Sequence, residues 1–154
     1  RGKPIDRVFI EEFLTRHRGD IQGRVLEVFE PGYTRWLGGD RVSRADVLDV
    51  NPMNRRATIL ADLARPETLP PEALAAFDCF ILTQTLQYIY DLRAALSHAH
   101  RILKPGGVLL CTLPSVSRVN YEDGGLDSGD FWRFTEASCT LTVQISQLFS
   151  RYSM

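Results

Sequence analysis

The sequence predicts an α/β fold built on a doubly wound, mainly parallel sheet. Two observations favour it: several strand-length segments are apolar on both faces, and segments with helical periodicity alternate with them. Strands of the first kind belong to the middle of a sheet that is covered on both sides. Their alternation with helices is typical of right-handed βαβ units. Ligands in such folds bind beyond the carboxyl ends of the strands.

Two helices are expected, over residues 4–18 and 91–103. In each of them the apolar side chains recur at helical spacing and form one stripe. In the first helix the stripe consists of Ile5, Val8, Phe9, Phe13 and Leu14. Gly19 can end the first helix, and the Pro-Gly-Gly run at residues 105–107 can end the second.

Five strands are expected, and they lie within residues 24–29, 42–50, 57–61, 78–83 and 108–113. Residues 33–37 are long enough only for a helical turn, and residues 72–76 for a short helix. The tail fits either a strand, with Leu141, Val143 and Ile145 alternating, or a helix. We favour a helix, with Thr135 as a candidate N-cap.

Length and composition predict one globular domain. The chain has 154 residues, of which 44% are hydrophobic and 24% charged, an ordinary globular mix. Within this domain we expect an N-terminal helix over residues 1–19, a βαβ core over 23–113, and a loop with a C-terminal segment over 114–154. The net charge of −1 argues against nucleic acid as a partner, because phosphate binding usually needs a basic excess.

The sequence also predicts a cytoplasmic protein without membrane contact. No apolar run approaches the ~20 residues of a membrane-spanning helix, and the first residues show no signal-peptide core. Three widely spaced cysteines predict neither a disulfide framework nor a metal site. His98 and His100 face different directions on a helix and are expected to be solvated.

Polar residues follow the predicted strands at the positions where a ligand would lie. Gly32 follows the first strand, where a glycine lets backbone N–H groups approach a ligand. Asp46 and Asp49 follow the second, where a carboxylate can accept hydrogen bonds from ribose hydroxyls. A strand-to-helix turn and solvated loop carboxylates remain the simpler interpretations of these residues.

The third and fourth strand ends add a second group of candidates. The carboxylate of Asp62 can accept the exocyclic amine of an adenine while Leu63 packs on the ring, although Asp62 also suits a turn. Thr83 and Gln84 can hydrogen-bond a ligand or cap the next helix.

Two segments together resemble class I S-adenosylmethionine-dependent methyltransferases of the type 11 group. The first runs from Phe77-Asp78 through Thr83-Gln84-Thr85-Leu86-Gln87-Tyr88-Ile89, and the second is Leu103-Lys104-Pro105-Gly106-Gly107 with the apolar run after it. Val25-Leu26-Glu27-Val28 is similar to the strand half of the first family motif, and Asp130-Phe131-Trp132-Arg133-Phe134-Thr135 to a segment of some members. The resemblance covers residues 23–135 and implies a Rossmann-like methyltransferase fold with S-adenosylmethionine as cofactor.

The resemblance also implies roles for the candidate site residues. Glu27, Glu30 and Gly32 would border the methionine part of the cofactor, and Asp46, or failing that Asp49, would hold the ribose. Asp62 and Leu63 would contact the adenine, and Thr83, Gln84 and Leu86 would line the far side of the cofactor. No metal is expected.

The chain departs from the family pattern in three ways. Phe29 and Pro31 stand where small residues of a glycine-rich loop are usual, and Gln87-Tyr88 replaces an acid–histidine pair. The sheet would also lack the last strands of the family fold. Its fifth strand would then be an apolar edge that the tail or a second copy of the chain covers, which predicts a possible homodimer.

The function expected is methyl transfer to a small-molecule or sugar-type acceptor. Candidates on the acceptor side are Tyr88, Tyr121, Trp132 and Arg133. The alternative is a catalytically impaired methyltransferase-like binding module, favoured by the irregular loop. A nicotinamide-binding domain is disfavoured because Gly-x-Gly-x-x-Gly is missing after the first strand.

Overall fold

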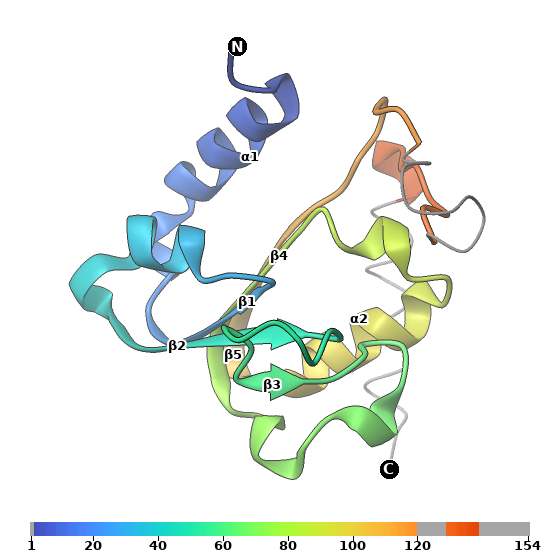
Figure 1. The fold of residues 1–154 in the computed structure, drawn as a ribbon. Helices are drawn as coiled ribbons and strands as arrows, with labels where there is room; N and C mark the ends of the chain where they lie inside the picture. The colour runs from blue at the N-terminus through green and yellow to red at the C-terminus, as the bar shows by residue number, and fades with distance from the viewer. Residues whose placement is uncertain (1, 120–128, 139–154) are drawn as a thin grey trace.

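The computed structural model describes residues 2–119 and 129–138, which form a parallel sheet flanked by helices (Figure 1). The strands are β1 (Gly23–Val28), β2 (Val42–Asp49), β3 (Ile59–Leu60), β4 (Phe77–Thr83) and β5 (Leu103–Thr112). Their spatial order is β3-β2-β1-β4-β5, and all four neighbouring pairs are parallel. This confirms the predicted fold class. The strand order reverses beside β1, so β1, β2 and β4 bring their carboxyl ends to one crevice.

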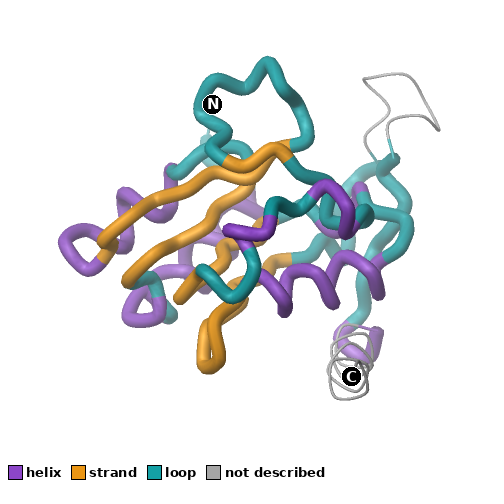
Figure 2. The backbone as a smooth tube through the Cα atoms, turned by 90° about the horizontal axis from the view of Figure 1, so that it is seen from below, coloured by secondary structure: helices purple, strands orange, loops and turns teal. Residues whose placement is uncertain are grey.

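The helices α1 (Ile5–Arg16) and α2 (Leu92–Ile102) cover opposite faces of the sheet (Figures 1 and 2). The first contributes Ile10 and Leu14 to a core cluster that also contains Val25 of β1. The second packs in a different cluster together with Leu26. Val25 and Leu26 are sequence neighbours, and successive side chains of a strand point to opposite faces. The helices α1 and α2 therefore pack on opposite faces of the sheet.

The connection from β1 to β2 contains only short helical turns. Residues Thr34–Gly38 form one turn of π-helix, and Gly39–Arg41 form a 3-10 turn. The prediction of a short turn in this place is confirmed. The other 3-10 turns are Arg18–Asp20, Pro66–Thr68, Pro71–Ala73 and Leu86–Tyr88, so the helix expected over residues 72–76 is shorter than predicted.

Two sequence-based expectations about α2 and β5 need correction. The Pro-Gly-Gly run follows α2, but β5 already begins at Leu103 and contains the run as an irregularity in its pairing with β4. His98 is buried instead of solvated, and its Nδ1 lies 2.7 Å from the carbonyl oxygen of Leu63. A backbone carbonyl therefore satisfies the ring where the sequence pattern suggested solvent.

The end of the described chain supports one expectation about the tail. Residues 136–138 are helical, and the hydroxyl oxygen of Thr135 accepts the backbone N–H of Ser138 at 3.2 Å. This is the N-cap bond that was predicted for Thr135. The helix expected over Leu141 to Phe149 lies outside the described residues. No helix in residues 2–119 or 129–138 combines the length and hydrophobicity needed to cross a bilayer.

Gly23→Ala is expected to lower the free energy of unfolding by about 1–3 kcal/mol. Gly23 has a φ of 66°, and an added Cβ would collide with the carboxylate of Asp78. That carboxylate accepts the backbone N–H of Arg24 at 2.8 Å, so it cannot move away freely. Urea unfolding measures the change. Gly19→Ala is the matched control, because its Cβ would meet nothing within 4 Å, and equal stability losses in both variants would contradict the explanation.

Candidate functional site

A cavity of ≈ 730 Å³ lies at the carboxyl ends of β1, β2 and β4, beside the start of α1. This is the place that the topology predicts for a ligand. Six of the ten predicted site residues line it: Glu27, Glu30, Gly32, Asp49, Thr83 and Gln84. We call it the strand-tip cavity.

Glu27 holds the backbone where β1 leaves the sheet. Its side chain is buried, and its two oxygens accept the N–H groups of Tyr33 at 3.0 Å and Thr34 at 2.8 Å. Burial raises the pKa of Glu27, and the N–H donors oppose that rise only in part. Glu27 therefore fixes the loop that borders the cavity.

The loop between β1 and the first helical turn offers a ligand few backbone donors. The N–H of Phe29 donates to the carbonyl of Leu48 at 3.0 Å, and the N–H of Glu30 donates to the carbonyl of Val28 at 2.9 Å. Pro31 has no N–H. Phe29 has a φ of 71°, and the residue is 60% exposed, so it lines the strand-tip cavity without plugging it.

Asp49 is the acid that β2 presents to the cavity. Its Oδ1 accepts the backbone N–H of Asn51 at 2.9 Å, and its Oδ2 accepts the side-chain amide of Asn54 at 2.6 Å. The same amide nitrogen donates to the carbonyl of Phe29 at 2.8 Å. Asn54 thus ties the end of β2 to the loop after β1 and fixes the orientation of Asp49.

Asp46 does not follow the second strand, as the sequence suggested, but lies inside β2 with 1% of its surface exposed. It accepts hydrogen bonds from Arg24 at 2.7 Å, Arg44 at 3.0 Å and the hydroxyl of Thr58 at 2.9 Å. It is not among the residues that line the strand-tip cavity. The physical reason is that a buried carboxylate must be paired, and here the chain supplies all its partners.

Asp62, Leu63 and Leu86 also stand apart from the cavity lining. The carboxylate of Asp62 accepts the N–H of Ala64 at 2.8 Å, as in the turn that was the simpler interpretation. Leu63 and Leu86 are buried in the core cluster on the α2 side.

The end of β4 completes the cavity with short polar residues. Gln84 has a φ of 47°, and its N–H bonds to the carbonyl of Thr112 in β5 at 3.0 Å. The hydroxyl of Thr85 donates to the carbonyl of Thr83 at 2.9 Å. Tyr88, a candidate on the acceptor side, lines the same cavity.

Comparison with known proteins assigns the family. Residues 33–111, half of the chain, match the family model described as "Methyltransferase domain". The chain belongs to this methyltransferase domain family. No curated protein matches the sequence.

Solved structures share the fold of this methyltransferase domain at low sequence identity. One is a Haloferax volcanii putative methyltransferase in complex with the activator Trm112 (TM-score 0.60, 18% identity, 92% of this chain and 71% of that chain). A second is phosphoethanolamine N-methyltransferase 2 of Haemonchus contortus with S-adenosyl-L-methionine (TM-score 0.57, 14% identity, 81% of this chain and 33% of that chain). A third is the [4+2]-cyclase SpnF (TM-score 0.61, 17% identity, 92% of this chain and 57% of that chain). The chain spans between 33% and 71% of the length of these three structures.

Acidic side chains outnumber basic ones in the lining of the strand-tip cavity of the methyltransferase domain, and one of them, Glu11, is paired with Lys3 at 2.5 Å. Five carboxylates and one guanidinium line it, and they belong to Asp6, Glu11, Glu27, Glu30, Asp49 and Arg7. Sequence reasoning missed the three charged residues of α1, together with Tyr33 and Trp36. No local signal shows which face of an N-terminal helix will meet the tips of strands that come later in the chain.

Two of the acceptor-side candidates already have hydrogen-bond partners within the chain. The indole N–H of Trp132 donates to the carbonyl of Ile89 at 3.0 Å. Arg133 pairs with Asp130 at 2.6 Å and donates to the carbonyl of Ser117 at 2.9 Å. Arg133 therefore forms an ion pair within the chain. Tyr121 lies outside the described residues.

Proposed function

We propose that this domain binds S-adenosylmethionine in the strand-tip cavity and methylates a small-molecule acceptor. The observation that supports this most is the excess of carboxylates around the cavity. The cofactor carries a positive sulfonium and an ammonium group, and a cavity lined by one sign of charge concentrates the opposite sign. When bound, it would supply an electrophilic methyl group. The protein's task is then to align the acceptor and exclude water.

The loop geometry favours this cofactor over a dinucleotide. A pyrophosphate needs free backbone N–H groups at a glycine-rich turn. Here the N–H groups of Phe29 and Glu30 already bond to the chain, and Pro31 has none. Carboxylates on both sides would also repel a pyrophosphate.

The residues around the cavity suggest a division of roles. Asp49 is placed to accept hydrogen bonds from ribose hydroxyls, while Glu27 and Glu30 border the methionine part. Gly32 leaves room on the loop side, and Thr83 and Gln84 close the side formed by β4. Asp62 and Leu63 remain the proposed adenine contacts beyond this lining.

Calorimetric titration with S-adenosylhomocysteine and with NAD tests the proposal. We expect saturable micromolar binding of the first compound and none of the second. Failure of S-adenosylhomocysteine to bind would contradict the proposal, and binding of NAD would replace it with a dinucleotide site.

A second candidate function is cofactor or partner binding without methyl transfer. The irregular loop with Pro31 favours it, and the cyclase SpnF, which has a similar fold, illustrates that this fold does not imply one reaction. Binding of S-adenosylhomocysteine with no turnover across a panel of hydroxyl and amine acceptors would support this candidate.

Asn54→Ala is expected to weaken S-adenosylhomocysteine binding about fivefold to tenfold. The substitution removes the amide that holds both Asp49 and the carbonyl of Phe29. Calorimetry gives the affinity. Asn51→Ala is the matched control, because among the described residues the side chain of Asn51 bonds only to the N–H of Met53. Equal affinities of the two variants would remove Asn54 as a positioning residue.

A further inference from the structure

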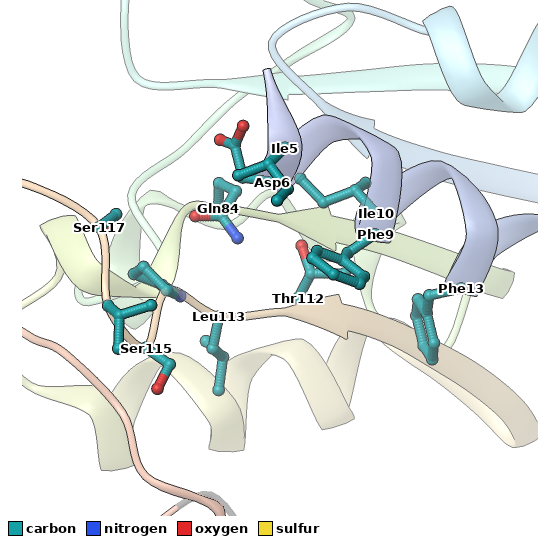
Figure 3. A pocket seen from close by; sticks show the side chains of 12 residues that line it. Ile5, Asp6, Phe9, Ile10, Phe13, Gln84, Thr112, Leu113, Ser115 and Ser117 are labelled. Carbon is teal, nitrogen blue, oxygen red and sulfur yellow. The ribbon is translucent and has the colours of Figure 1, made fainter. Parts of the chain in front are cut away.

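A second hollow of ≈ 420 Å³ lies between α1 and the segment that follows β5 (Figure 3). Its walls are mainly apolar: Ile5, Phe9 and Phe13 come from α1, and Leu113 and Val116 come from the segment after β5. Three of these side chains are strongly exposed, namely Ile5 at 75%, Phe9 at 63% and Val116 at 98%. We call this hollow the apolar groove.

The apolar groove adjoins the strand-tip cavity. Asp6, Ile10 and Gln84 line both spaces, so the two spaces meet at these three residues. Figure 3 shows Asp6 and Gln84 close together where α1 passes the end of β4. A molecule in the groove would therefore reach the edge of the proposed cofactor site.

The groove has a polar floor. Thr112 lies there beside Gln84, and its buried hydroxyl has no hydrogen-bond partner among the described residues. Gln84 adopts a φ of 47°, and backbone strain of this kind persists where it positions a side chain for a ligand.

We propose that the apolar groove binds the body of the methyl acceptor, an aromatic or alkyl molecule that carries one hydroxyl or amine group. The inference rests on the proposed function. The apolar body would pack against Phe9 and Val116, and its polar group would lie beside Thr112 and Gln84. A sugar fits poorly, because each of its hydroxyls needs a partner and the walls offer few.

The reaction this arrangement serves is a simple displacement. The lone pair of the acceptor's oxygen or nitrogen forms the new bond to the methyl carbon. The carbon–sulfur bond breaks, its electron pair stays on sulfur, and the proton of the acceptor passes to water.

Titration with 2-naphthol, followed by its fluorescence, tests the inference on the full chain with and without saturating S-adenosylhomocysteine. We expect saturable binding of 2-naphthol in both cases and none of methyl glucoside. Competition between 2-naphthol and S-adenosylhomocysteine would place the naphthol in the strand-tip cavity and overturn the inference. So would the lack of saturable 2-naphthol binding, or preferential binding of the glucoside.

Two variants on α1 locate the site. Phe9→Asp should weaken 2-naphthol binding at least about tenfold, because it removes a wall and adds a charge. Val8→Asp, next to it but outside both linings and 44% exposed, should leave the affinity within about twofold. Equal effects would overturn the inference. The separate titration with S-adenosylhomocysteine shows that each variant is folded, and failure of the wild type to bind it would count against the proposed function instead.

Discussion

Replacing Asp46 with alanine is expected to lower the free energy of unfolding by about 3 kcal/mol. The Asp46 side chain is 1% exposed and neutralises Arg24, which is itself largely buried. Without the carboxylate, the guanidinium of Arg24 loses its charged partner in the interior, and the hydroxyl of Thr58 loses one of its hydrogen bonds. The loss stays at the lower end of the range for buried pairs because Arg44 is 61% exposed and can turn to solvent.

Urea unfolding at neutral pH measures this loss, and Asp40→Ala is the matched control. Asp40 is exposed on the short turn before β2, so its removal should change stability by less than about 0.5 kcal/mol. A similar small change in Asp46→Ala would contradict the view that Asp46 is a structural anchor.

The pH dependence of stability gives an independent check on Asp46. Burial alone would raise the pKa of Asp46, but hydrogen bonds from Arg24, Thr58 and Arg44 outweigh it and hold the pKa below its ordinary value. An acid with a lowered pKa in the folded state stabilises the fold above its unfolded value of about 3.9. This contribution should disappear as the pH falls through the folded value, and the wild type should lose its advantage over Asp46→Ala there.

Patterns within short segments predicted the layered fold well. Strand-length apolar runs and amphipathic helices depend on which faces are buried, and local periodicity records this directly. The start of β5 was missed because its first residues include Pro105 and two glycines, which indicate a break although Leu103 before them and Val108 after them both pair with β4. The burial of His98 was missed because its partner, the carbonyl of Leu63, is a backbone group from a distant segment.

The candidate site was predictable only where it follows from topology. Residues at the tips of parallel strands must converge, which brings Glu27, Asp49 and Gln84 to one cavity. The choice between Asp46 and Asp49 depends on where β2 ends and on which arginines reach each acid, and neither is visible in the strand pattern. The docking of Asp6 and Arg7 depends on how α1 packs across the sheet, which no segment of the sequence encodes alone.

Asp49→Ala is expected to weaken S-adenosylhomocysteine binding about 30-fold, or by about 2 kcal/mol. Hydrogen bonds to a charged acceptor are stronger than neutral ones, and we propose that the carboxylate of Asp49 accepts bonds from the ribose hydroxyls. Asn54 and the N–H of Asn51 hold that carboxylate in place before any ligand arrives. Little ordering cost then opposes binding.

The comparison that decides this prediction is Asp62→Ala, measured by the same calorimetric titration. Asp62 is also a half-buried aspartate near the end of a strand, but its carboxylate serves its own turn and it lies outside the lining of the strand-tip cavity. A loss in both variants would support ribose contact by Asp49 and adenine contact by Asp62. A loss in Asp49→Ala alone would remove Asp62 from the adenine site. Unchanged affinity in Asp49→Ala would remove the ribose from the tip of β2, because no other carboxylate of that strand lines the cavity.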